Sequence, residues 1–190
     1  MTRKNLAVLV MMTAAMPGIV GAAPAEAAPP AHTAYTAADF ENYRPDAKAV
    51  TYAPGLVPVG SSATVASVPA AGGTTTVLLY VEALSPNHQY GAHVHQKHCG
   101  PKAEDSGPHY QNVPDPVQPS VDPAYANLHN EIWLDFTTDQ HGNAWSLSTV
   151  NWQFTDRHAG SVVVHAEHTR TDPGHAGTAG ARLACVDVDF

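Results

Sequence analysis

Four histidines stand in positions that could bind a metal ion. His93 and His95 open the stretch "HVHQKHCGPKAEDSGPHY", which ends with His109. On a β-strand, residues two apart point to the same face, so His93 and His95 would lie side by side. His165 ends the apolar run "SVVVH". Imidazole nitrogens suit Cu, Zn, Fe and Ni, and a tetragonal nitrogen set favours Cu(II). Solvated surface histidines, or a hydrogen-bonded core histidine at 165, would give the same pattern.

The elements that must position these histidines are predicted to be β-strands. Runs of Thr, Val and Tyr are separated by Gly, Pro and Asn, and no convincing helical period occurs after residue 27. This pattern predicts an all-β domain with eight antiparallel strands in a sandwich or barrel. We expect strands near 48–53, 62–68, 74–84, 90–96, 130–138, 143–150, 160–167 and 182–189. Two long loops, at 96–127 and about 168–181, are expected to carry function because such loops are uncommon in compact domains.

The first residues have the pattern of a secretory signal peptide. A basic start at Arg3 and Lys4 is followed by an apolar run from Leu6 to Val20 and then by small residues. Pro17 and Gly18 interrupt that run before it reaches the length of a membrane span, so no membrane anchor is expected. We predict a signal peptide at 1–27, a flexible lead-in at 28–46 and a β domain at 47–190. The protein is predicted to be secreted, either extracellular or in the cell envelope.

Charge and cysteine content limit the functions further. Nine basic residues against 17 acidic residues give a net charge of −8, which disfavours binding to nucleic acid or to anionic membranes. Cys99 and Cys185 are the two cysteines, and in an oxidising compartment they are expected to form one disulfide. A thiolate metal ligand or a reactive thiol is the alternative for these cysteines.

Four motifs in this order resemble the copper/zinc superoxide dismutase family: "YGAHVH" (90–95), "GPHY" (107–110), "VVVHAE" (162–167) and "GTAGARLAC" (177–185). The resemblance implies a Greek-key β-fold with His93, His95, His109 and His165 as copper ligands. It also implies a Cys99–Cys185 disulfide and an Arg182 that receives superoxide beside the copper. By the same resemblance, His109 would release copper on reduction and take up a proton for peroxide.

The zinc site of the two-metal relatives is incomplete in this chain. No histidine or cysteine lies between His109 and His129, and Ile132 stands where the family has a zinc-binding aspartate. The loop between the fourth copper histidine and the arginine is also short. These departures indicate the copper-only branch, with one copper ion and no zinc. Metal-bound histidines usually direct their second nitrogen to an oxygen acceptor, and Glu131 is our candidate for His109. A solvated acidic residue is the alternative for Glu131.

The sequence therefore predicts an enzyme, a copper-dependent superoxide dismutase that converts superoxide to O2 and H2O2. One alternative is a secreted copper-binding or copper-buffering protein with the same fold. Another is a two-metal dismutase with unusual zinc ligands such as Asp115, Asp122 or Asp135. A zinc hydrolase is disfavoured because four converging histidines leave less room for the open three-ligand site that such enzymes use.

Overall fold

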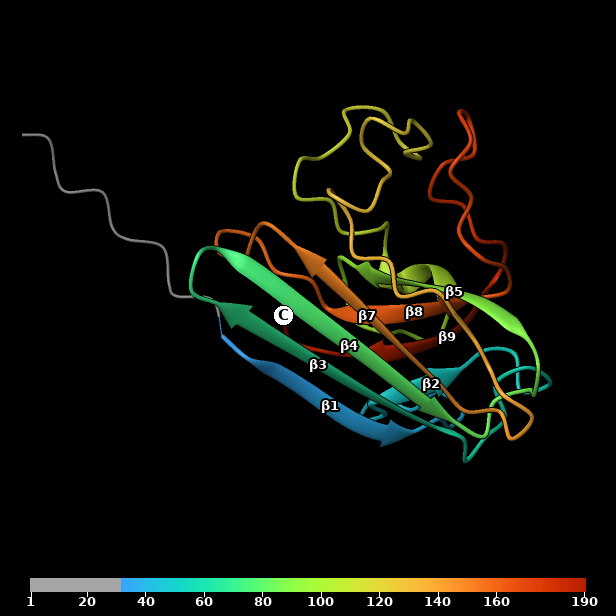
Figure 1. The fold of residues 1–190 in the computed structure, drawn as a ribbon. Helices are drawn as coiled ribbons and strands as arrows, with labels where there is room; N and C mark the ends of the chain where they lie inside the picture. The colour runs from blue at the N-terminus through green and yellow to red at the C-terminus, as the bar shows by residue number, and fades with distance from the viewer. Residues whose placement is uncertain (1–31) are drawn as a thin grey trace, which may run out of the picture.

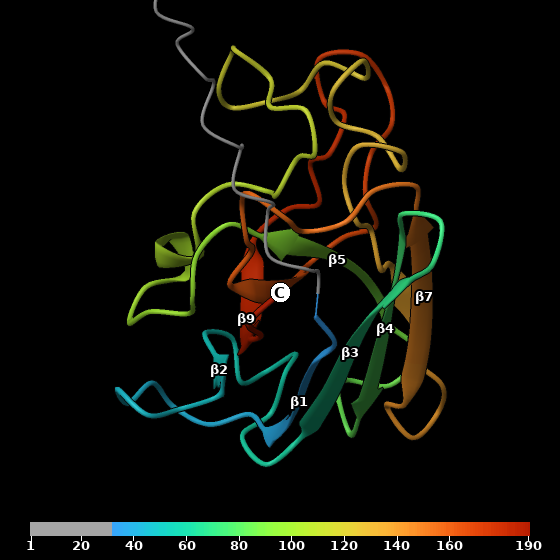
Figure 2. The same ribbon diagram turned by 90° about the vertical axis from the view of Figure 1, so that its left-hand side faces the viewer.

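The computed structural model describes residues 32–190, which form nine strands in two antiparallel sheets (Figures 1 and 2). The first sheet has the order β1-β3-β4-β7: β1 (Ala34–Asp39), β3 (Ser62–Ala70), β4 (Thr74–Glu82) and β7 (Ala144–Val150). The second has the order β2-β9-β8-β5-β6: β2 (Ala49–Thr51), β9 (Arg182–Asp187), β8 (Ser161–His165), β5 (Gln89–His95) and β6 (Phe136–Thr137). One 3-10 helix, η1 (Ala103–Ser106), interrupts the first long loop. The expected all-β class is thus confirmed.

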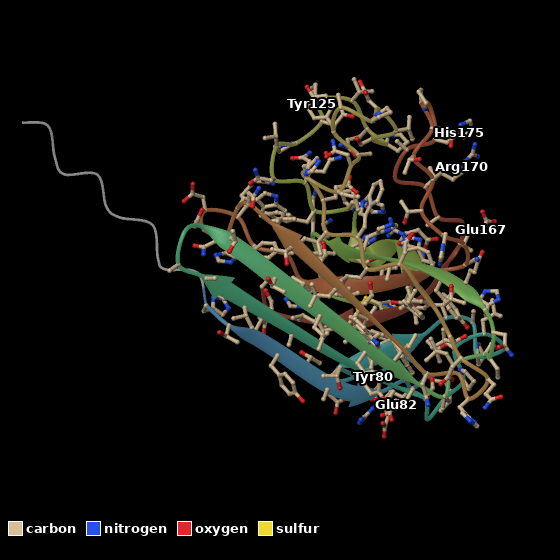
Figure 3. All side chains as sticks on the ribbon, viewed as in Figure 1. Tyr80, Glu82, Tyr125, Glu167, Arg170 and His175 are labelled. Carbon is tan, nitrogen blue, oxygen red and sulfur yellow. A yellow bond between two sulfur atoms is a disulfide. The ribbon has the colours of Figure 1, made fainter. Side chains whose placement is uncertain are left out.

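Alternating burial explains why β3 and β4 form one layer of a sandwich. Val65, Val77 and Leu79 are fully buried, whereas the neighbouring Thr64 and Thr76 are partly exposed. This period of two is typical of a sheet that packs one face on a core. The labelled Tyr80 and Glu82 mark the outer face of β4 (Figure 3). The apolar side chains of both sheets meet between the layers.

The second sheet is buried on both faces along β5 and β8. Val162 and Val164 belong to the hydrophobic core between the sheets, and Ala92 and Val94 of β5 join them there. The residues between them in sequence point to the opposite face, which is also closed to solvent. That second buried face is where the histidines lie.

Two long loops cover this end of the molecule. The loop between β5 and β6 and the loop between β8 and β9 rise from the same end of the sandwich in both views (Figures 1 and 2). Tyr125 marks the first loop in Figure 3, and Arg170 and His175 mark the second. The prediction of two long loops is confirmed, and the loops contact each other where the Gly174 amide donates to Val121 O at 3.2 Å.

The structure corrects the prediction for part of the N-terminal lead-in. We expected a flexible segment at 28–46, but Ala34–Asp39 forms β1 and pairs with β3 over six residues. Alanine has a low strand propensity, so "AYTAAD" carries little strand signal, and pairing with β3 decides its conformation. Each of the eight expected strands has a counterpart, but the one at 130–138 shrinks to Phe136–Thr137. The proposed signal peptide at 1–27 lies outside the described residues.

Among residues 32–190, no helix is long and apolar enough to cross a membrane.

Candidate metal centre

Four imidazole rings converge on one point beneath the loops. His93 and His95 lie on the outer face of β5, and His165 ends β8 opposite Gly91. His109 reaches the same point from the first loop through an isolated bridge to His95. One nitrogen of each ring lies within 4.8 Å of the others. The four histidines expected from the sequence are therefore brought together.

Backbone carbonyls accept from two of these rings. The Nδ1 of His95 lies 2.9 Å from the carbonyl oxygen of Gly107, and the Nδ1 of His165 lies 3.5 Å from that of Gly180. Because a carbonyl oxygen only accepts, the hydrogen of each ring sits on Nδ1. The Nε2 atoms of His95 and His165 then present lone pairs to each other at 3.4 Å.

A buried carboxylate holds the third ring. Glu131 is 1% exposed, and its Oε2 lies 2.8 Å from the Nδ1 of His109. The same oxygen accepts from the Trp133 indole at 2.7 Å, and Oε1 accepts from the Gln111 amide at 2.8 Å. Glu131 is thus a fully hydrogen-bonded buried acid, placed against His109 as the sequence analysis expected, and it is not solvated.

The fourth ring, that of His93, is held through a hydroxyl group. Its Nε2 lies 2.6 Å from the Oγ1 of Thr169, which in turn lies 2.7 Å from Asp135 Oδ1. The other ring nitrogen, Nδ1, is buried and has no hydrogen-bond partner. A buried nitrogen without a partner is costly unless a ligand completes it.

This donor set fits a late first-row transition metal. Burial, followed by the charge of the neighbouring His109, holds the pKa of His93 and His95 well below 6.5 and lowers the pKa of His165 to about 3. These rings are therefore neutral at pH 7, with lone pairs free to bind a cation. Four nitrogen ligands are typical of sites for copper or zinc. The residues present fit a metal ion, but they do not by themselves choose between these two metals.

Two of the three acidic residues considered as unusual zinc ligands, Asp115 and Asp122, form hydrogen bonds within the first loop. Asp115 accepts from the Val117 amide and the Ser120 hydroxyl, and Asp122 accepts from the Ala124 amide. Within residues 32–190, the other close group of ligand-type side chains is Cys99, Cys185 and Asp187, where the two sulfurs are joined in a disulfide.

A cavity of about 270 Å³ leads to the histidines, with His109, His165 and Arg182 in its wall. Arg182 begins β9, and its Nη1 donates to Ala103 O at 3.1 Å and to Ser106 Oγ at 3.0 Å, both in η1. Burial lowers the pKa of Arg182 from its ordinary value. An arginine remains charged at neutral pH after such a shift, so the cavity carries a fixed positive charge.

The disulfide joins the start of the first loop to β9. Cys99 and Cys185 are bonded, and the Cys99 amide donates to Asp187 Oδ1 at 2.6 Å. The thiolate alternative therefore does not apply to this structure.

Sequence reasoning missed several residues that hold the rings. Thr169, Gln111 and Trp133 carry no motif, and Asp135 was considered only as a zinc ligand. Trp133 and Asp135 have one available signal, because "EIWLD" places them at alternate residues after Glu131. Thr169 and Gln111 have none.

No family model matches the chain, and no curated protein sequence matches it. Among solved structures, the fold is similar to that of the clock protein EA4, with a TM-score of 0.52 and 15% identity over 84% of this chain and 94% of that chain. It is also similar to a mutant of an SOD-like protein from Bacillus subtilis, with a TM-score of 0.53 and 13% identity over 67% of this chain and 90% of that chain. At such identities the likeness shows the fold alone, which is that of SOD-like proteins.

Proposed function

We propose that this chain is a copper-dependent superoxide dismutase, 2 O2•− + 2 H+ → O2 + H2O2. The observation that supports it most is the placement of Arg182 in the wall of the cavity that also exposes His109 and His165. A protein that only stored a metal would need no cationic group beside it. Bound copper would supply the one-electron chemistry by alternating between Cu(II) and Cu(I).

The residues of the chain would do the rest. His93, His95, His109 and His165 would hold one copper ion, and Arg182 would attract and orient the small anion. The Nε2 of His109 is proposed to carry a proton for peroxide, while its Nδ1 stays on Glu131. Since that Nδ1 is occupied by a carboxylate, it is not free to bind zinc, which supports one metal ion per chain. The disulfide is consistent with an oxidising location, and we propose that residues 1–27 direct secretion.

The test is to express the full-length chain, collect the secreted protein, load it with copper and zinc, and measure its metal content and its dismutase activity. We expect one copper, no zinc and dismutase activity. Copper without turnover would favour a copper-buffering protein, and one ion of each metal would favour a two-metal enzyme. Either result contradicts the proposal.

The role of His109 can be tested by substitution. His109→Ala should lower activity by about 100-fold or more, because loss of a proton donor alone typically has an effect of that size. The substitution also removes a metal ligand. His141, which is exposed on a turn, offers the matched control, and His141→Ala should keep wild-type activity. Full activity in His109→Ala would show that this residue has been wrongly assigned.

A further inference from the structure

The His93 ring is held by a residue from a distant part of the chain. Thr169 lies 76 positions after His93, in the loop between β8 and β9, and its hydroxyl oxygen is 2.6 Å from His93 Nε2. Asp135 lies 3.9 Å from the same nitrogen, too far for a hydrogen bond. The hydroxyl is therefore the link between the carboxylate and the ring.

The direction of these hydrogen bonds follows from their donors. Asp135 Oδ2 accepts from the Thr169 amide at 2.7 Å, and Oδ1 accepts from the Ala92 amide at 3.2 Å. The Thr169 hydroxyl is 2.7 Å from Oδ1 and has one hydrogen, which it donates to that oxygen. Its remaining lone pairs face His93, so His93 Nε2 must carry the ring hydrogen.

We infer that Thr169 is a positioning residue that fixes His93 in the tautomer competent to bind metal. With the hydrogen on Nε2, the buried Nδ1 keeps its lone pair and has no hydrogen-bond partner. The His109 and His165 rings lie 4.1 and 4.8 Å from the His93 ring, centroid to centroid. The inference rests on the proposed metal-binding function. Partners of this kind change metal affinity by about 10- to 100-fold when removed.

Close packing holds the loop that carries Thr169 against β5. Gly91 on β5 has no side chain, and a Cβ there would lie 2.5 Å from Glu167 O and 2.7 Å from the Ala179 Cβ. The loop therefore lies directly on the strand that carries His93. Because Ala179 and Gly180 of this loop also line the cavity, Thr169 connects the position of a ligand ring to the wall of the anion site.

Two substitutions at one position test the role of the hydroxyl. Thr169→Val keeps the shape and removes the hydroxyl, whereas Thr169→Ser keeps the hydroxyl. We expect Thr169→Val to weaken Cu(II) binding by about 10- to 100-fold in a chelator competition and to change the Cu(II) electron paramagnetic resonance spectrum. Thr169→Ser should restore both properties. Thr171→Val, an exposed position in the same loop, is the matched control.

The outcomes separate this inference from the proposed function. If the wild type binds no copper, the proposed function fails, and the inference falls with it. If the wild type binds copper and Thr169→Val shows the same affinity and spectrum, only the inference is overturned. Should Thr169→Val not fold by circular dichroism, Thr169→Ala decides, because it also removes the hydroxyl and adds no group beside Asp135. An unchanged affinity in that variant would also overturn the inference.

Discussion

Glu131 shows how one buried side chain can define a site. Its two oxygens accept from three N–H donors, on His109, Trp133 and Gln111. A carboxylate can satisfy all three because it only accepts. An amide of the same size cannot, since its NH2 group would face at least one donor. Two acceptor oxygens, and not shape alone, are what the position requires.

Glu131→Gln should therefore lower both stability and metal affinity. We expect a loss of about 1–3 kcal/mol in the free energy of unfolding of the metal-free protein, from a buried donor left without an acceptor. Copper affinity should fall by about 10- to 100-fold because the His109 ring is no longer held. Urea unfolding and chelator competition measure the two effects. Glu82→Gln, on the outer face of β4, should change neither, and a Glu131→Gln protein with wild-type values would contradict this account.

At the scale of elements, β5 contributes to both the core and the metal site, because its successive side chains point to opposite faces of the sheet. Ala92 and Val94 pack into the core, while His93 and His95 face the loops. Gly91 allows the second loop to lie against the strand, as described above. The strand and its loop thus form one unit, and the site depends on their contact.

Gly91→Ala should disturb that unit. The added methyl group would press on the Glu167 carbonyl and on Ala179, and overpacking of this kind costs about 1–3 kcal/mol. Copper affinity should also fall, since Thr169 belongs to the displaced loop. Gly55→Ala, where a Cβ would meet nothing within 4 Å, should stay within about 0.5 kcal/mol of the wild type. Chemical denaturation of both variants measures the difference, and equal stabilities would exclude the proposed close packing.

Much of this arrangement could be predicted from the sequence, and the rest depends on tertiary contacts. Alternation in "YGAHVH" predicted the strand and the common face of its histidines. The hydrogen bond between His93 and Thr169 could not be predicted, because it depends on the path of the loop after β8. That path follows a shift in strand register between Val164 and His165. Strand β1 was missed for a similar reason, since its alanine-rich sequence becomes a strand only beside β3.

At the scale of the whole molecule, the metal ligands connect separate parts of the chain. Two histidines lie on β5, one lies on β8 and one lies in the first loop. A bound ion would therefore hold the first loop to the sheet. Lone pairs of His95 and His165 also face each other at 3.4 Å. A cation between them would remove that repulsion.

Removal of copper should therefore lower the melting temperature. Free copper at 100 times its dissociation constant adds about 2.7 kcal/mol of stability. For a chain of this size, that corresponds to a shift of about 5–10 °C. Calorimetry with copper and then with excess chelator would measure it, and His109→Ala should show a smaller shift than His141→Ala. An unchanged melting temperature on copper addition would contradict the predicted site.

The disulfide secures the arginine side of the site and not the strands that carry the histidines. Cys185 lies three residues after Arg182 on β9, and Cys99 lies just before η1, whose Ala103 and Ser106 hold the arginine. Neither cysteine belongs to β5 or β8, which carry three of the four histidines. A newly made chain under reducing conditions could thus gather its imidazoles before its arginine is secured. Under the proposed function, turnover would then begin only when the thiols are oxidised, so a chain loaded with metal under reducing conditions would stay inactive.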